Sequence, residues 1–172
     1  DAWYHEAVDF VLARGYMNGM GNGKFAPKGA LNRAMMVQVL YNMQGRPESD
    51  GELTFHDVSE DEWFFEAIDW AYENEIVEGY SAERFGPRNP ITREQMMVIL
   101  YRYTELIGGN TTANGDLSQF VDGNKTSAWA LEAMRWAHRI AGGQGQRRSG
   151  SHRYPQPSCR GGTGTAALLL LH

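Results

Sequence analysis

The 172-residue chain contains a single cysteine, Cys159, so it cannot form an intramolecular disulfide bond. It also has no long apolar run, because the longest, at 166–171, is far shorter than the roughly 20 residues that a membrane-spanning helix needs. No signal peptide is visible, and we interpret the abrupt start at Asp1 as the edge of a fragment. The sequence therefore predicts no membrane span and a fold stabilised by apolar packing.

Basic residues are scarce outside the C-terminal end of the chain. The chain has 16 Lys and Arg against 21 Asp and Glu, a net charge of −5, but residues 139–172 hold five Arg and no acid. Without those five, residues 1–138 keep 11 basic and 21 acidic side chains, a net charge of −10. Such an acidic body repels the phosphate backbone, so we exclude nucleic acid as a general partner. An anionic ligand would have to be held by a few local arginines.

The sequence patterns of common catalytic and metal sites are missing as well. The run from Gly19 to Lys24 is not a phosphate-binding loop, because its spacing is wrong and Phe25 stands where Ser or Thr is needed. The acidic run 57–62 lacks the central Gly of an EF-hand loop. Three histidines lack metal-ligand spacing: His5, His56 and His138. We therefore expect no enzyme activity, no cofactor and no metal site in this segment.

The chain does contain an internal repeat of 60 residues. Shifted by 60 positions it matches itself without a gap. The matched pairs include Trp3/Trp63, Ala7/Ala67, Asp9/Asp69, Gly19/Gly79, Phe25/Phe85, Pro27/Pro87, Arg33/Arg93, Leu40/Leu100 and Tyr41/Tyr101. A third copy begins later, where Phe120, Asp122, Trp129 and Trp136 echo Phe55, Asp57, Trp63 and Trp70. One such copy cannot cover its own apolar face, so we expect the copies to pack on one another.

Each copy predicts two helices joined by a glycine-rich loop. In the second copy, the spacing of five residues predicts one face of the first helix: Trp63, Ala67, Trp70, Ala71 and Asn74. Ser59 with Glu62 has the spacing of a capping box that would start this helix. The second helices should begin at Asn32 and at Thr92, which has Gln95 as its capping-box partner. Their apolar faces are assigned to the core: Met36, Val37, Leu40 and Met43 in the first copy, and Met96, Met97, Leu100 and Tyr103 in the second.

The ordered series of motifs resembles the S-layer homology domain. It reads Phe55-His56-Asp57-Val58, Trp63-Phe64, Gly79 through Phe85 and Pro87, then Thr92-Arg93-Glu94-Gln95, and the first copy repeats most of it. Three such domains typically form a pseudo-threefold bundle. The resemblance thus implies an all-α fold of tandem helix-loop-helix repeats with an incomplete third repeat. The expected units are repeat 1 at 1–46, truncated at its N-terminal end, repeat 2 at 55–107, the start of repeat 3 at 120–140, and a tail at 141–172.

The resemblance also implies a function. S-layer homology domains bind secondary cell-wall polysaccharide, often carrying a pyruvate ketal, and hold surface proteins to the bacterial envelope. We therefore expect a secreted, extracellular, non-catalytic anchor at the cell wall or S-layer of a Gram-positive-type envelope. The guanidinium groups at the family's basic motif position would grip the ketal carboxylate. The expected ligand-binding residues are Arg33, Arg93, Trp3, Trp63, Gly19, Gly79, Asp57 and Glu94.

Other roles stay open for several of these residues. Arg33 and Arg93 could form salt bridges with acids of a neighbouring repeat, the two Trp could pack in the core or an interface, and Asp57 could orient its turn. The first copy also departs from the family pattern, because Asn32-Arg33-Ala34-Met35 lacks the family's acidic residue and the leading Phe-x-Asp-Val is missing. The alternative function is a helical-repeat module that binds protein partners, its own copies included, or builds a surface lattice, with structural arginines.

The repeat pattern stops after Ile140. Residues 141–172 are rich in Gly, Arg and Ser and end in a Leu run, which one interpretation takes as a disordered tail. A second interpretation is translation out of frame: codons shifted by one base from Gly143 permit Gly-Lys-Gly-Asn-Gly-Val-Leu-Asp-Pro, which aligns with the loop beginning at Gly19. In both cases the third copy lacks its loop, its Arg and its second helix, and Cys159 has no expected role.

Overall fold

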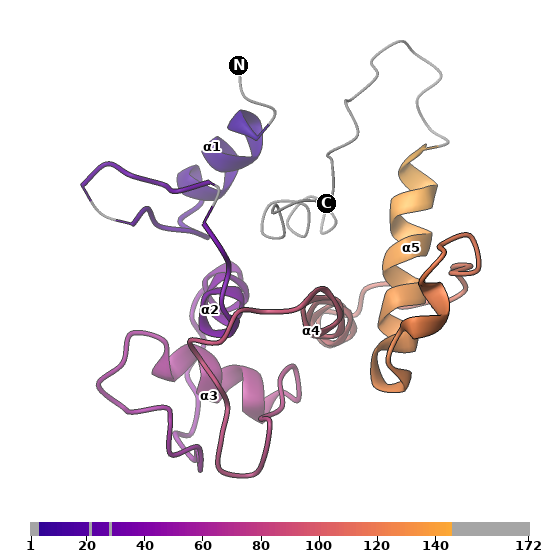
Figure 1. Ribbon diagram of the computed structural model, residues 1–172. Coiled ribbons are helices and arrows are strands. Elements are labelled where there is room, and N and C mark those ends of the chain that lie inside the picture. The colour runs from indigo at the N-terminus through magenta and orange to yellow at the C-terminus, as the bar shows by residue number, and fades with distance from the viewer. Residues whose placement is uncertain (1–3, 21, 28, 146–172) are drawn as a thin grey trace.

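The computed structural model describes residues 4–20, 22–27 and 29–145 (Figure 1). This described part contains five α-helices and two 3₁₀ turns, and no strand. The helices are α1 (His5–Ala13), α2 (Arg33–Met43), α3 (Phe65–Glu73), α4 (Arg93–Leu106) and α5 (Leu131–Gly145), and the 3₁₀ turns are η1 (Gly123–Lys125) and η2 (Ala128–Ala130). The prediction of an all-α fold is confirmed.

The second helix of each repeat begins where the sequence predicts. Asn32 caps α2, because its side chain accepts a hydrogen bond from the Met35 backbone N–H at 2.8 Å. Thr92 and Gln95 form the predicted capping box at the start of α4. These side chains satisfy helix-end groups that lack an intrahelical partner.

The first helix of repeat 2 begins later than predicted. α3 starts at Phe65, and its N-cap residue Phe64 makes no side-chain cap, so the capping box expected at Ser59 and Glu62 is wrong. The Glu62 N–H instead closes a backbone turn on the Ser59 carbonyl oxygen at 3.0 Å. Phe64 is buried, and this anchored ring fixes the start of α3 in place of a polar cap. The later start leaves Trp63 outside the helix.

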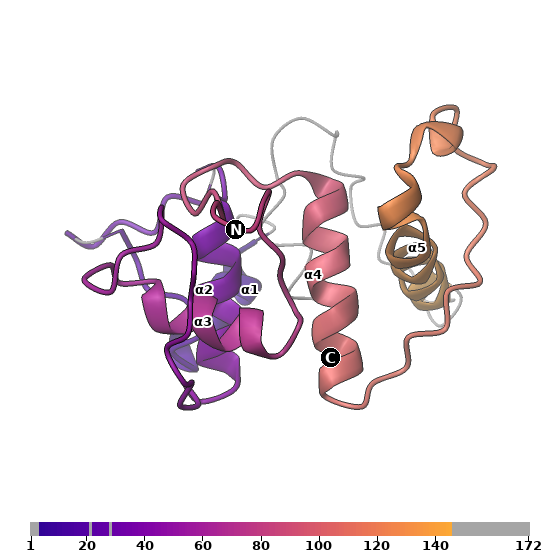
Figure 2. The same cartoon turned by 90° about the horizontal axis from the view of Figure 1, so that it is seen from below.

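Helix packing repeats along the chain. α3 packs on α2 and α5 packs on α4, with α4 standing between the α2–α3 pair and α5 (Figure 2). The ring centroids of Tyr41 and Trp70 are 5.7 Å apart, and those of the equivalent Tyr101 and Trp136 are also 5.7 Å apart. Such aromatic pairs add roughly 0.5–1.5 kcal/mol each beyond the burial of their area. α5 is therefore seated on α4 as α3 is seated on α2.

The predicted apolar faces form the core. Seven of their eight members are buried: Met36, Val37, Leu40, Met96, Met97, Leu100 and Tyr103. The eighth, Met43, is partly buried and packs against this core. Of the third repeat, the described residues include the two 3₁₀ turns and one α-helix, α5, which continues beyond Ile140 to Gly145. The prediction for the tail, including Cys159, falls from residue 146 onward outside the described residues.

Candidate functional site

Repeats 1 and 2 meet where the N-terminal end of α2 contacts residues 78–90, which are termed the repeat-2 loop. This contact is the first junction. The backbone N–H groups of Arg33 and Ala34 donate to the carbonyl oxygens of Asn89 at 3.1 Å and Pro87 at 2.9 Å. The first N–H groups of a helix can hold an anion when they are unpaired. Here the repeat-2 loop uses them, so the backbone at the start of α2 is not a free anion site.

The Arg33 side chain is enclosed by the same loop. Only 5% of Arg33 is exposed; its Nε donates to the Phe85 carbonyl oxygen at 3.1 Å and its Nη2 to the Glu78 carbonyl oxygen at 2.6 Å. The guanidinium carbon lies 4.8 Å from the ring centroid of Tyr80 and 4.4 Å from that of Phe85, within range of a cation–π interaction. Burial lowers the pKa of Arg33 from its usual value, and Tyr80 and Asp57 oppose the shift.

Arg33 thus joins the two repeats through main-chain oxygens and aromatic rings. The salt bridge to a neighbouring Asp or Glu, which the sequence left open, is not found at this position among the described residues. One nitrogen of the guanidinium, Nη1, has no hydrogen-bond partner among those residues. The other two nitrogens are held by main-chain oxygens of repeat 2.

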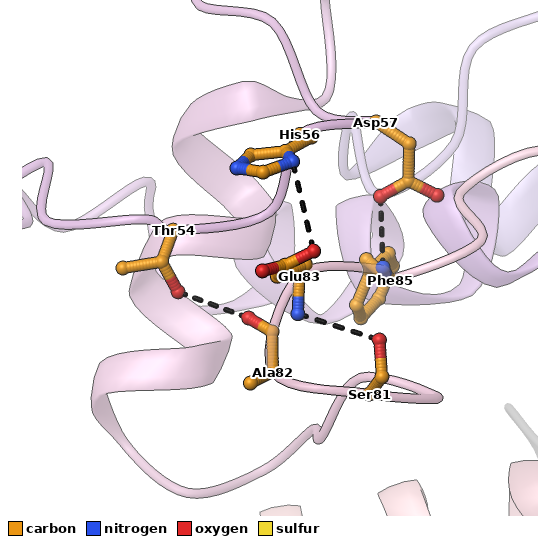
Figure 3. A network of polar contacts seen from close by, with 7 residues as sticks. All are labelled: Thr54, His56, Asp57, Ser81, Ala82, Glu83 and Phe85. Carbon is orange, nitrogen blue, oxygen red and sulfur yellow. Dashed lines mark hydrogen bonds and ion pairs between the residues drawn. The ribbon is translucent and has the colours of Figure 1, made fainter.

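Asp57 holds the repeat-2 loop in shape. Its two carboxylate oxygens accept hydrogen bonds from the backbone N–H groups of Phe85 and Gly86, each at 2.8 Å, and Figure 3 shows the bond to Phe85. The same figure shows three further contacts along the loop: Thr54 with Ala82, Ser81 with Glu83, and His56 with Glu83. In this structure Asp57 binds the backbone of the repeat-2 loop, a structural contact between distant segments of repeat 2.

The predicted glycines allow close backbone approach. A Cβ atom on Gly79 would lie 2.5 Å from a ring carbon of Phe55 and 2.7 Å from the Arg84 carbonyl oxygen, so no larger residue fits without a shift. A Cβ atom on Gly19 would lie 2.8 Å from the Lys24 carbonyl oxygen. Both glycines therefore shape their loops, whichever ligand the loops meet.

Trp63 is exposed, whereas Trp3 lies outside the described residues. Trp63 exposes 56% of its surface, and its ring packs edge-on against Phe64 with 5.1 Å between centroids. The Arg88 guanidinium lies 5.7 Å from the centroid of the same Phe64 ring and pairs with Glu62 at 2.5 Å. Because Arg88 belongs to the repeat-2 loop, an exposed indole and a guanidinium lie against the same Phe64 ring close to the first junction.

Repeats 2 and 3 meet at the N-terminal end of α4, which is the second junction. Glu94 accepts hydrogen bonds from the Ser127 backbone N–H at 2.8 Å and from its hydroxyl at 2.9 Å, and so ties repeat 3 to α4. Arg93 is exposed and has no partner among the described residues. Trp129, the equivalent of Trp63, exposes 59% of its surface. The first junction encloses its arginine, whereas the second leaves its arginine open.

Four residues at the junctions were not predicted as site residues from the sequence: Tyr80, Arg88, Ser127 and Trp129. The repeat alignment contained a signal for two of them. Arg88 falls 60 positions after another basic residue, Lys28, and Trp129 was already matched to Trp63. Tyr80 and Ser127 had no such signal, since their roles depend on contacts between repeats.

Two further features are absent from the described part of the chain. No group of three or more His, Cys, Asp or Glu side chains there is placed to hold a metal ion. No helix among those residues is both long enough and apolar enough to cross a membrane.

The fold and its junctions define a class of module: tandem helix-loop-helix repeats in which one repeat encloses an arginine of the previous one. Residues 1–35 and 54–97 match the S-layer homology domain family, and the chain belongs to this family. The family is one of binding modules that anchor proteins at the cell surface. The resemblance inferred from the motifs is confirmed.

The curated relatives include surface proteins. The chain is 36% identical to the surface-layer 125 kDa protein of Lysinibacillus sphaericus over 132 residues, which is 77% of the chain and 11% of the relative. It is 27% identical to exoglucanase XynX of Acetivibrio thermocellus over 140 residues, 81% of the chain and 13% of that protein. A cellulosome-anchoring protein of Acetivibrio thermocellus is 26% identical over 97 residues, 54% of the chain and 22% of that protein.

The chain therefore spans less than a quarter of the length of each of these relatives. Other relatives are a surface layer protein of Brevibacillus choshinensis and a middle cell wall protein of Brevibacillus brevis. Together with the family, they place the chain at the cell surface in association with the cell wall.

Proposed function

We propose that this chain is a non-catalytic anchor that binds an acidic, pyruvylated secondary cell-wall polysaccharide and so holds a larger surface protein to the envelope. The observation that carries the proposal is the pairing of exposed Trp63 with the Arg88 guanidinium, which both lie against the Phe64 ring beside the first junction. Aromatic and guanidinium groups at one place suit a sugar that carries a carboxylate.

The chemistry assigns a role to each group. The pyruvate ketal presents a carboxylate, and guanidinium hydrogen bonds to a carboxylate are stronger than those between neutral groups. The exposed face of Trp63 offers an apolar surface for the C–H face of a sugar ring. Because the body of the chain carries a net charge of −10, these local cations must provide the attraction. Arg93, exposed at the second junction, is proposed as an additional contact for acid groups.

Trp63 and Trp129 provide a matched test. Both are exposed and both precede the first helix of their repeat, but only Trp63 lies by a complete junction. The variants Trp63→Ala and Trp129→Ala are sedimented with purified cell walls, with and without prior removal of the wall polysaccharide. From the bound fraction at several wall concentrations, we expect Trp63→Ala to raise Kd at least about tenfold, equivalent to roughly 1.4 kcal/mol. Trp129→Ala should bind like the parent chain, and circular dichroism should show unchanged helicity in both.

Two outcomes would contradict the proposal. Equal binding to stripped walls would favour the alternative function, a protein-binding or lattice-forming module with structural arginines. Equal binding by both Trp variants would remove the first junction as the sugar site. Arg93→Ala, made on an exposed residue, tests the additional contact separately.

A further inference from the structure

The second junction repeats the frame of the first without the part that covers it. At the first junction the repeat-2 loop lies against four groups: the Arg33 side chain, the first backbone N–H groups of α2, the Phe55 ring and the Asp57 carboxylate. At the second junction the equivalent groups are Arg93, the start of α4, Phe120 and Asp122. No segment equivalent to the repeat-2 loop follows α5 among the described residues.

The two frames share similar ring distances and an equivalent turn. Phe55 lies 5.0 Å from Tyr72 between ring centroids, and Phe120 lies 5.4 Å from His138, the residue at the Tyr72 position. The turn after each Phe is closed in the same way: Val58 N–H to Phe55 oxygen at 3.2 Å, and Gly123 N–H to Phe120 oxygen at 3.0 Å. With the equal centroid distances of the Tyr–Trp pairs, these contacts show that Phe120 and its turn lie against α5 as Phe55 and its turn lie against α3.

The uncovered groups are exposed or unpaired. Phe55 is 4% exposed, because the Phe85 ring lies 5.6 Å away, whereas Phe120 is 49% exposed. The Asp122 side chain has no hydrogen-bond partner among the described residues, although Asp57 has two. Arg33 is enclosed and Arg93 is open.

We propose that Arg93, Phe120 and Asp122 form a docking surface for a polypeptide loop of the repeat-2 type supplied by another chain. The occupant is a segment folded into turns like those that close residues 80–84 and 86–89, with Gly at its start and Phe-Gly-Pro near its end. The carbonyl oxygens at its Glu78 and Phe85 positions accept hydrogen bonds from the Arg93 guanidinium. The backbone N–H groups of its Phe-Gly pair donate to the Asp122 carboxylate, and its Phe ring packs on Phe120. Its last carbonyl oxygens pair with the first N–H groups of α4.

The first junction also defines the specificity. The Phe85 ring is needed, because it contacts both the Phe55 ring and the guanidinium. A side chain at the Gly79 position would meet the Phe55 ring at 2.5 Å, so the occupant needs Gly there to clear Phe120. The docking surface should therefore reject loop segments that lack either residue.

The test uses the full chain and a synthetic peptide with the sequence of residues 78–90, labelled with fluorescein at its N-terminus. Fluorescence anisotropy should show saturable binding with Kd below about 1 mM. The Phe85→Ala and Gly79→Ala peptides should bind at least about tenfold more weakly. In the full chain Phe120→Ala, Asp122→Asn and Arg93→Ala should each weaken binding several-fold. Arg135→Ala, an exposed arginine of α5, serves as the control and should not.

Asp122→Asn separates this surface from polysaccharide binding. A carboxylate repels an acidic sugar, so its removal should leave wall binding unchanged or raised while peptide binding falls. Absence of saturable binding up to about 1 mM, or equal binding of the Phe85→Ala peptide, would overturn the inference. Peptide affinity that is unaffected by Phe120→Ala and Asp122→Asn would place the peptide elsewhere and also overturn it.

Discussion

Arg33 and Arg93 occupy the same position in two repeats, yet only one is enclosed, so the pair isolates what enclosure contributes to stability. In Arg33→Ala the chain loses two hydrogen bonds from a charged donor, at 3.1 and 2.6 Å, and two ring contacts. Hydrogen bonds to charged groups contribute about 1.5–3 kcal/mol each, and cation–π contacts about 0.5–2 kcal/mol.

Opposing costs reduce the net effect. The folded state desolvates the guanidinium, the same burial that lowers the pKa of Arg33, and this cost disappears in the variant. The carbonyl oxygens of Glu78 and Phe85 would remain near the junction without their donor. Weighing these effects, we expect Arg33→Ala to lower the free energy of unfolding by about 3 kcal/mol, a large part of the total for a small domain.

Urea unfolding followed by circular dichroism and Trp fluorescence measures this loss, with m compared between variants to confirm the same transition. Arg93→Ala is the matched control and should change the free energy of unfolding by less than about 0.5 kcal/mol, because an exposed, unpaired side chain contributes little. Arg33→Lys should recover less than half of the loss, since an ammonium group cannot reproduce the planar fork. Equal effects of Arg33→Ala and Arg93→Ala would refute the reasoning.

Two further predictions concern packing and ionisation. Gly79→Ala should lower the free energy of unfolding by about 1–3 kcal/mol, because the added Cβ atom meets Phe55 and Arg84. The control Gly142→Ala, in the open part of α5, should be neutral or stabilising. Equal urea midpoints for the two variants would contradict this prediction. Burial raises the pKa of Tyr103 above its usual 10.0. The neutral phenol therefore stabilises the folded state fully below pH 10, and this stability is lost as the pH rises through the raised pKa. Unfolding measured from pH 8 to about 11.5 should show a loss that is smaller in Tyr103→Phe, and identical pH profiles would show that Tyr103 does not cause it.

The helices and their faces could be predicted from the sequence because they depend on local patterns. Thr92 with Gln95 and Asn32 are adjacent to the turns that they cap, and the apolar period of α4 lies within one segment. The start of α3 was mispredicted for the same reason: Ser59 and Glu62 had the right spacing, but the burial of Phe64, a tertiary effect, set the helix boundary.

The state of the two arginines could not be predicted in this way. Arg33 and Arg93 are identical in the repeat alignment, and only the loop of the following repeat distinguishes them. The contact joins residues 45 and 52 positions apart in sequence, so no local window contains it. The sequence offered ligand contact and salt bridges as roles for Arg33, while the structure shows main-chain oxygens and rings as its partners.

The enclosure of Arg33 also changes what counts as one unit of this protein. The sequence repeat runs from one Trp to the next, but the repeat-2 loop closes around a side chain that belongs to the preceding copy. A segment cut at the sequence boundaries would leave that loop without its centre and the preceding helix without acceptors for its first N–H groups. Evolution can lengthen or shorten such an array by whole copies, but each terminal copy then needs a neighbour, or a substitute for one, to complete it.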